Sequence, residues 1–100
     1  AEIPLETARL CLQVMELADS LYGKIDFCVL SDLGIGVQAG HTGVIGALYN
    51  TAINLPELED DLLADRLKGE LVRLRTAADD LLPRVQDKIH GQPVFSLMKD

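Results

Sequence analysis

The sequence predicts an all-α fold, a bundle of long antiparallel helices around a central helix rich in Gly and Ala. Apolar residues recur at helical spacings of three and four along most of the chain. Hydrophobic residues make up 48% of the 100 residues and aromatic ones only 4%, which favours helices packed through Leu, Ala and Val. The segment from Leu33 to Pro56 contains no Asp, Glu, Lys or Arg. Such a helix needs cover on all sides in water, so we expect it at the centre of a single domain spanning residues 1–100.

The first helix is expected from Pro4 to Tyr22. Proline suits the first turn of a helix, and Gly23 is placed to end this one. One apolar stripe is expected to face the core, formed by Leu10, Val14, Leu17 and Leu21. A connector follows over residues 24–30, in which we expect four buried side chains: Phe27, Cys28, Val29 and Leu30.

The central helix is expected to start with Ser31 as its N-cap and Asp32 in its first turn. Asp32 and Asn50 are eighteen residues apart, about five full turns, so their side chains point the same way. Five small residues lie within about 60° of that line, as does Asn54: Gly36, Ala39, Gly43, Gly46 and Ala47. Glycine costs a helix about 1 kcal/mol relative to Ala. We therefore expect close approach by a neighbouring helix or a ligand along this stripe.

Alternative interpretations of the polar side chains stay open. Asp32 favours the helix dipole in any first turn, and Asn50 also suits a solvated helix end. Asn54, with Glu57 three residues on, resembles a capping box. His41 lies on the opposite face of the helix and has no partner suggested by the sequence, which favours a structural role.

The third helix is expected after a break at residues 54–57, with the acidic residues 57–61 complementing its dipole. Its core positions are Leu63, Leu67, Leu71, Leu74, Ala78 and Leu81. Pro83 removes a helical hydrogen bond, so the sequence predicts a kink or stop near Leu82. Residues 92–100 show no periodicity and are expected to form a loose end.

Composition argues against several functional classes. The net charge is −7 and the nine Lys and Arg form no cluster, which excludes a basic nucleic-acid surface. A membrane span over residues 33–56 is disfavoured by six polar side chains and by the lack of flanking positive charge. Cys11 and Cys28 match no metal-ligand spacing, so we expect two free thiols and no metal. Because thiols stay free in a reducing compartment, we also expect a cytoplasmic location.

The residues from Ser31 to Leu55 carry a family resemblance. Ser31-Asp32-Leu33-Gly34, the small-residue helix after it, and Asn50-Thr51-Ala52-Ile53-Asn54-Leu55 resemble the cyclodeaminase/cyclohydrolase family, which includes formimidoyltetrahydrofolate cyclodeaminase domains and methenyltetrahydrofolate cyclohydrolases. The resemblance extends over about Ile3 to Leu81. The chain departs from the family in having Thr51 where Val is preferred, and Lys24-Ile25-Asp26-Phe27-Cys28 where many members have a Gly-Asn turn. The family domain is close to twice this length, so the resemblance implies its second half.

The resemblance implies one-carbon folate chemistry, without metal or redox cofactor. The reaction is either hydrolysis of methenyltetrahydrofolate or cyclisation of the formimino derivative with loss of ammonia. Both need proton transfer, and Asp32 is the acid of this chain on the stripe, so it is the predicted catalytic residue. Asn50, Asn54 and Gly36 are the predicted substrate-binding residues. The alternative is a non-catalytic helical interaction module, which would bind no folate.

The predicted site also implies an assembly. Asp32 and Asn50 lie about 27 Å apart along one helix axis, too far to hold the same small group. Two copies of the central helix that cross would bring Asp32 of one subunit nearer to Asn50 of the other. Family members resembling this chain are symmetric oligomers, so we expect a homodimer or larger homo-oligomer.

Overall fold

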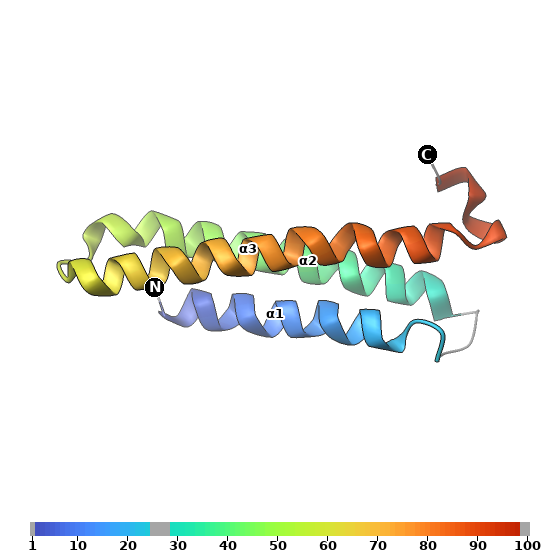
Figure 1. Ribbon diagram of the computed structural model, residues 1–100, viewed down its shortest axis with the longest axis horizontal. Helices are drawn as coiled ribbons and strands as arrows, with labels where there is room; N and C mark the ends of the chain where they lie inside the picture. The colour runs from blue at the N-terminus through green and yellow to red at the C-terminus, as the bar shows by residue number, and fades with distance from the viewer. Residues whose placement is uncertain (1, 25–28, 99–100) are drawn as a thin grey trace.

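A computed structural model describes residues 2–24 and 29–98, which form an elongated bundle of 53 × 24 × 15 Å (Figure 1). Its long helices are α1 (Glu2–Leu21), α2 (Leu30–Asn54) and α3 (Asp61–His90), with the short 3-10 helices η2 (Leu55–Glu57) and η3 (Pro93–Met98). Helices α1 and α3 run in one direction and α2 runs in the other (Figure 1). No strand occurs in the described residues, and the predicted all-α bundle of antiparallel helices is confirmed.

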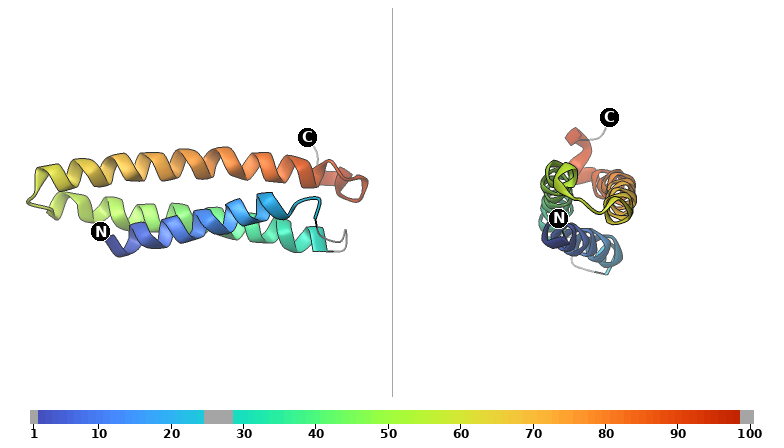
Figure 2. Two further views of the ribbon diagram at one scale, coloured as in Figure 1. Left: turned by 60° about the horizontal axis from the view of Figure 1, so that its bottom comes forward. Right: turned by 90° about the vertical axis from the view of Figure 1, so that its left-hand side faces the viewer.

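The core runs along the length of the bundle where the three helices meet. Viewed from one end, the helices form a triangle, and each packs against the other two (Figure 2). From α2 the core takes Leu33, Val37, Val44, Ala47 and Leu48. The predicted core positions of α3 are confirmed, with Leu67, Leu74, Ala78 and Leu81 buried and Leu63 and Leu71 partly buried against them.

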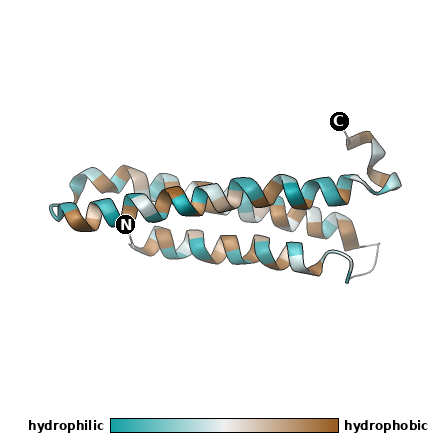
Figure 3. Cartoon of the chain, viewed as in Figure 1, coloured by the Kyte–Doolittle hydropathy of each residue, from teal (hydrophilic) through white to brown (hydrophobic). Residues whose placement is uncertain are grey.

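The predicted core face of α1 is wrong for three of its four residues, whereas the fourth, Leu21, is partly buried against the core. Leu10, Val14 and Leu17 are 50–57% exposed, whereas the opposite stripe is buried. That stripe contains Leu5, Ala8, Met15 and Ala18, with Cys11 and Leu12 partly buried beside them. This stripe packs against Gly40 and Gly43 of α2, where the missing side chains leave room for Met15 and Cys11. The three apolar residues Leu10, Val14 and Leu17 consequently remain on the outer surface of α1, and Figure 3 shows how hydrophobic residues recur along this helix.

The start of α2 differs from the prediction by two residues. The helix begins at Leu30, and its N-cap is Val29, which makes no side-chain capping hydrogen bond. Ser31 therefore lies inside the first turn together with Asp32. Leu30 is buried as expected and Val29 is partly buried, while Phe27 and Cys28 lie outside the described residues.

The predicted break between α2 and α3 is confirmed, but a different residue caps α3. The chain passes through η2, and Asp60 Oδ1 accepts a hydrogen bond from the Leu63 amide at 3.1 Å. Asn54 makes no capping bond; its Nδ2 instead donates to the Asn50 carbonyl at 2.9 Å. The capping-box interpretation of Asn54 is therefore wrong.

Helix α3 continues through Pro83 to His90. Of the predicted kink or stop near Leu82, the stop is therefore wrong. A proline inside a helix costs about 3 kcal/mol. Val85 and Ile89 follow it and are buried. Burying each such side chain contributes about 1.5–3 kcal/mol, enough together to offset that cost.

The described part of the C-terminal segment is also more ordered than predicted. Residues 93–98 form η3, and Phe95 packs against the core. Residues 99 and 100 lie outside the described part. Nearby, the Tyr22 hydroxyl donates to the Lys88 carbonyl and accepts from Gln92 Nε2. These bonds fix the end of α1 against the end of α3.

Ion pairs at the surface add to the contact between α1 and α3. Asp19 pairs with Lys88 Nζ at 2.9 Å and with Arg84 Nη2 at 3.4 Å. The hydrogen bond from Lys88, aided by the positive charge of Lys88 and Arg84, lowers the pKa of Asp19 below its ordinary value, against an opposing effect of burial. Further along, Arg9 Nε pairs with Glu70 Oε1 at 3.3 Å.

Candidate functional site

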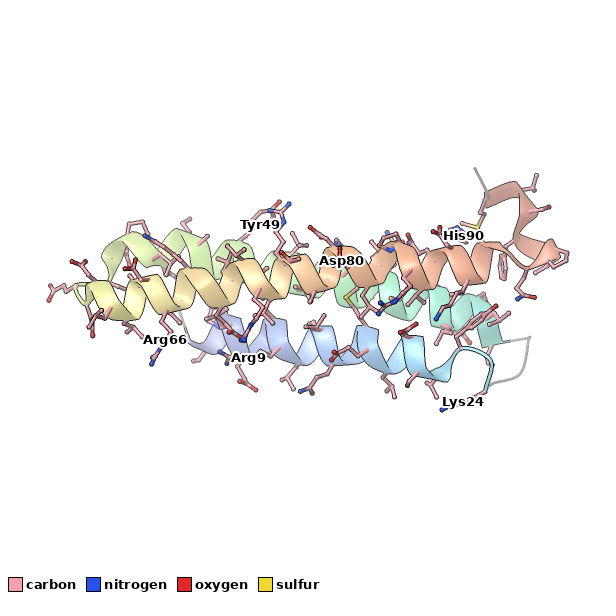
Figure 4. All side chains as sticks on the ribbon, in the orientation of Figure 1. Arg9, Lys24, Tyr49, Arg66, Asp80 and His90 are labelled. Atoms are coloured by element: carbon pink, nitrogen blue, oxygen red, sulfur yellow. The ribbon has the colours of Figure 1, made fainter. Side chains whose placement is uncertain are left out.

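One side of α2 is uncharged and is left exposed by α1 and α3. We call it the outward face and define it by Ile35, Ala39, Thr42, Gly46, Tyr49 and Ile53, all of which are exposed. Its three large apolar side chains, Ile35, Tyr49 and Ile53, are 67–75% exposed. Tyr49 lies on the side of the bundle away from α1 (Figure 4). The cover expected around a charge-free helix is therefore incomplete in a single chain.

Asp32 lies in the first turn of α2 and is exposed. On the helical wheel it lies at the edge of the outward face, about 20° from Ala39. A carboxylate in this place is accessible to a ligand on the outward face and can exchange protons with it.

Asn50 and Asn54 lie at the opposite end of α2, and both are exposed. The hydrogen bond between them runs from Asn54 Nδ2 to the backbone carbonyl of Asn50, so the Asn50 carboxamide takes no part in it. One helix does not bring either Asn near Asp32, because the axial separation of Asp32 and Asn50 is about 27 Å. The candidate site therefore has two separate polar ends.

Four of the five glycines of α2 divide into two groups; the fifth, Gly34, is in ordinary contact with Ile89. A Cβ atom at Gly43 would lie 2.5 Å from Sγ of Cys11, and one at Gly40 would lie 2.8 Å from Cγ of Met15. Only glycine fits these two positions without a shift in α1. Gly36 and Gly46, in contrast, have open space where a Cβ atom would lie, with no atom of a neighbouring element within 4 Å. The expected close approach is therefore found on the side of α1 and not along the whole stripe.

A groove lies beside the N-terminal half of α2, where it meets the end of α3 and η3. Its cavity has a volume of about 460 Å³, within the range of small-molecule sites. Most of the lining is apolar, and it comes from three segments: Leu30, Ser31, Gly34, Ile35, Gln38, Ala39, Gln86, Ile89, His90, Phe95 and Met98. His90 is visible at the base of the C-terminal segment (Figure 4). None of the four predicted site residues, Asp32, Asn50, Asn54 and Gly36, lines this groove. Two of its lining residues, Ile35 and Ala39, belong to the outward face, and a third, Ser31, directly precedes Asp32 in the sequence.

His41 has a partner that the sequence did not suggest. Its Nε2 lies 2.9 Å from Asp79 Oδ1, and Arg75 Nε lies 3.4 Å from Asp79 Oδ2. The hydrogen bond with His41, followed by that with Arg75, lowers the pKa of Asp79 below its ordinary value, against an opposing effect of burial. The pair joins α2 to α3, and it agrees with the structural role expected for His41.

Thr51, the departure from the family pattern, is fully buried. Its hydroxyl donates to the Ala47 carbonyl one turn earlier at 3.0 Å, so the polar group is satisfied inside the helix. Because Thr and Val have nearly the same shape, Thr51 fills the volume that Val would fill. The departure therefore leaves the packing of α2 intact.

The described residues lack the features of two other functional classes. No described helix is long and apolar enough to cross a lipid bilayer. Within the same residues, no three or more His, Cys, Asp or Glu side chains are grouped so that they could hold a metal ion.

Comparison with known proteins identifies the family. A sequence profile described as formiminotransferase-cyclodeaminase matches residues 1–73. A methenyltetrahydrofolate cyclohydrolase of Methylorubrum extorquens is 30% identical over 91 residues, which cover 91% of this chain and 44% of that protein. A formimidoyltransferase-cyclodeaminase of Rattus norvegicus is 31% identical over 72 residues, 72% of this chain and 13% of that protein.

A third relative agrees with the first two. The formimidoyltransferase-cyclodeaminase of Mus musculus is 33% identical over 64 residues, which cover 64% of this chain and 12% of that protein. No solved structure matches the chain. The chain spans less than half the length of each of these relatives, and the profile match includes α1, α2 and the start of α3. On this evidence the chain belongs to the formiminotransferase-cyclodeaminase family.

Proposed function

We propose that the protein containing this chain acts on a tetrahydrofolate derivative in one-carbon metabolism, as a methenyltetrahydrofolate cyclohydrolase or a formimidoyltetrahydrofolate cyclodeaminase. The observation that carries the proposal is the family match over α2, together with an exposed, uncharged outward face on that helix. A non-catalytic interaction module would not need two polar groups, Asp32 and Asn50, on one line of the helix at both ends of this face.

Asp32 is the proposed proton-transfer group. In the cyclohydrolase reaction, water adds to the methenyl carbon, the bond from that carbon to one folate nitrogen breaks, and a proton is released. In the cyclodeaminase reaction, a folate nitrogen attacks the formimino carbon and ammonia leaves. Each reaction needs a group that accepts one proton and returns another, and the exposed carboxylate of Asp32 is placed to do so.

The second part of the proposal is that the site is completed by a second copy of the chain. Two α2 helices that cross through their outward faces would cover Ile35, Tyr49 and Ile53. They would also bring Asn50 of the partner subunit toward Asp32, which removes the separation of about 27 Å along one axis. In this arrangement Asn50 and Asn54 bind the folate, and Gly36 leaves room for it close to the helix backbone.

A cytoplasmic location completes the proposal. Cys11 is a free thiol that packs against Gly43, and a reducing compartment keeps it in that form.

The proposed site residues need no further cofactor for this chemistry. Asp32, Asn50 and Asn54 supply carboxylate and carboxamide groups only, which suffice for acid–base catalysis and hydrogen bonding to a folate.

The test is an assay of the full-length protein with both substrates. Loss of methenyltetrahydrofolate absorbance measures the cyclohydrolase reaction, and ammonia release from formiminotetrahydrofolate measures the cyclodeaminase reaction. Turnover of one substrate well above the uncatalysed rate supports the proposal and decides between the two activities. Turnover of neither substrate, with no folate binding by calorimetry, would favour the interaction module.

A further inference from the structure

The groove at the end of the bundle has the chemistry of a binding site for a flat ring. Its two walls are α2 and α3, and η3 closes one side with Phe95 and Met98. Ile35 and Ile89 add branched apolar surface. A planar ring suits such a groove because apolar side chains from three segments can cover its surface.

A pair of carboxamides provides the polar edge of the groove. Gln86 Nε2 donates to Gln38 Oε1 at 2.8 Å, which joins α3 to α2. Each carboxamide has two donor hydrogens and one acceptor oxygen. The bond between them uses one donor and one acceptor site, so an NH₂ group and a carbonyl oxygen remain for a ligand. A ring that carries a lactam or an amino-substituted amidine on its edge matches this donor and acceptor pair.

The groove also reaches the outward face at the end of α2 that carries Asp32, although Asp32 itself does not line it. Ser31 lines it and directly precedes Asp32. Ala39 lines it too, and its position on the helical wheel is about 20° from that of Asp32. A ring in the groove would therefore have its neighbouring atoms near the Asp32 end of the outward face.

We propose that this groove binds the pterin ring of the folate, with Gln38 and Gln86 recognising its amino and oxo edge. The inference rests on the proposed function and deepens it, because it says which part of the ligand binds and where. No Lys or Arg occurs among the described residues that line the groove. The anionic glutamate end of a folate therefore lies outside it, and the uncharged ring lies inside.

The experiment measures binding of two probes to the full-length protein: 6-methylpterin, which lacks the glutamate end, and 5-formyltetrahydrofolate. Gln86→Leu removes the polar edge, and Gln13→Leu is the matched control on an exposed position of α1. Because one hydrogen bond contributes about 0.5–1.5 kcal/mol, we expect Gln86→Leu to weaken binding of both probes about two- to tenfold. Gln13→Leu should bind both probes like the wild type.

A second pair of variants tests the apolar wall. Phe95→Ala removes part of the wall formed by η3, and Val94→Ala changes the exposed neighbouring residue of the same segment. We expect only Phe95→Ala to weaken binding of 6-methylpterin. Circular dichroism of each variant shows whether the helices are intact.

The outcomes separate this inference from the proposed function. If the wild type binds 5-formyltetrahydrofolate and both groove variants bind it equally well, the groove is not the pterin site, although the proposed function stands. If 6-methylpterin binds in a manner that depends on Gln86 but neither substrate is turned over, the groove assignment stands and the proposed enzymatic function fails. Binding of neither probe to the wild type overturns the groove assignment directly.

Discussion

Both sides of α2 carry glycine, but the glycines on the two sides have different surroundings. On the side of α1, Gly40 and Gly43 make room for Met15 and Cys11, and a side chain at either position would meet atoms of α1 at less than 3 Å. On the outward face, Gly46 has open space around it and its neighbours Tyr49 and Ile53 are exposed. Packing within one chain explains the two inner glycines. It does not explain Gly46.

This difference separates stability from function along a single helix. A helix with no charge between Asp32 and Glu57 normally lies inside a protein, and the outward face of this one has no cover in a single chain. Changes on the inner side should therefore alter the free energy of unfolding. Changes on the outward face should alter assembly, binding and turnover.

The largest effect is expected from Asp32→Asn, at the edge of the outward face. The variant keeps the shape of the side chain and removes its ability to exchange a proton. We expect turnover by the full-length protein to fall at least about a hundredfold, the low end of acid–base contributions, while the helical fold is retained. Asp65→Asn makes the same charge change at an exposed position of α3 and is the control. Near-normal turnover by the Asp32 variant would show that Asp32 takes no part in catalysis and only interacts with the dipole of α2.

The next effect is expected from Gly43→Leu, on the inner side. The new side chain meets Cys11, so overpacking should lower the free energy of unfolding by about 1–3 kcal/mol. Gly69→Leu is the matched control, because Gly69 lies in α3 with nothing within 4 Å of an added Cβ atom. That control should gain up to about 1 kcal/mol, since Leu favours a helix more than Gly does. Chemical denaturation measures both, and a gain in stability for Gly43→Leu would contradict close packing against α1.

The smallest effect is expected from removing a surface ion pair, because it contributes less to the free energy of unfolding than the packing of the inner side does. The pKa of Asp19 is lowered in the folded protein by its hydrogen bond to Lys88, and the carboxylate is partly exposed. A lowered pKa gives stability that is complete above the ordinary value of 3.8 and is lost as the pH falls through the folded value.

For Asp19→Asn we therefore expect a loss of less than about 1 kcal/mol at neutral pH. The difference from the wild type should shrink below the ordinary carboxyl pKa. Denaturation at a series of pH values measures it, and a difference that grows toward acidic pH would have the wrong sign for this ion pair.

Local patterns in the sequence were sufficient to predict the helices, their antiparallel order and the core face of α3. They could not choose between the two apolar stripes of α1, because that choice depends on how closely Cys11 and Met15 approach Gly43 and Gly40. The continuation of α3 through Pro83 likewise depends on burial of Val85 and Ile89 against other helices. Both are effects of tertiary packing.

The candidate site shows the same limit. Helical spacing predicted Asp32, Asn50 and Asn54 on one side of α2, and the structure leaves all three exposed there. The groove could not be predicted, because Gln38 and Gln86 meet across 48 positions of the chain and η3 has no periodicity to reveal it. The pairing of His41 with Asp79, 38 residues away, had no local signal either.

The measurement that tests the central claim most directly compares Gly46→Trp with Gly69→Trp in the full-length protein. Both glycines have open space around them in one chain, so one chain tolerates a large side chain at either position. If a second copy covers the outward face, Gly46→Trp lowers the molar mass measured by light scattering and lowers turnover with it, while Gly69→Trp keeps both at the wild-type values. A wild-type mass and wild-type turnover for Gly46→Trp would contradict the claim that the outward face of α2 is covered in the working protein.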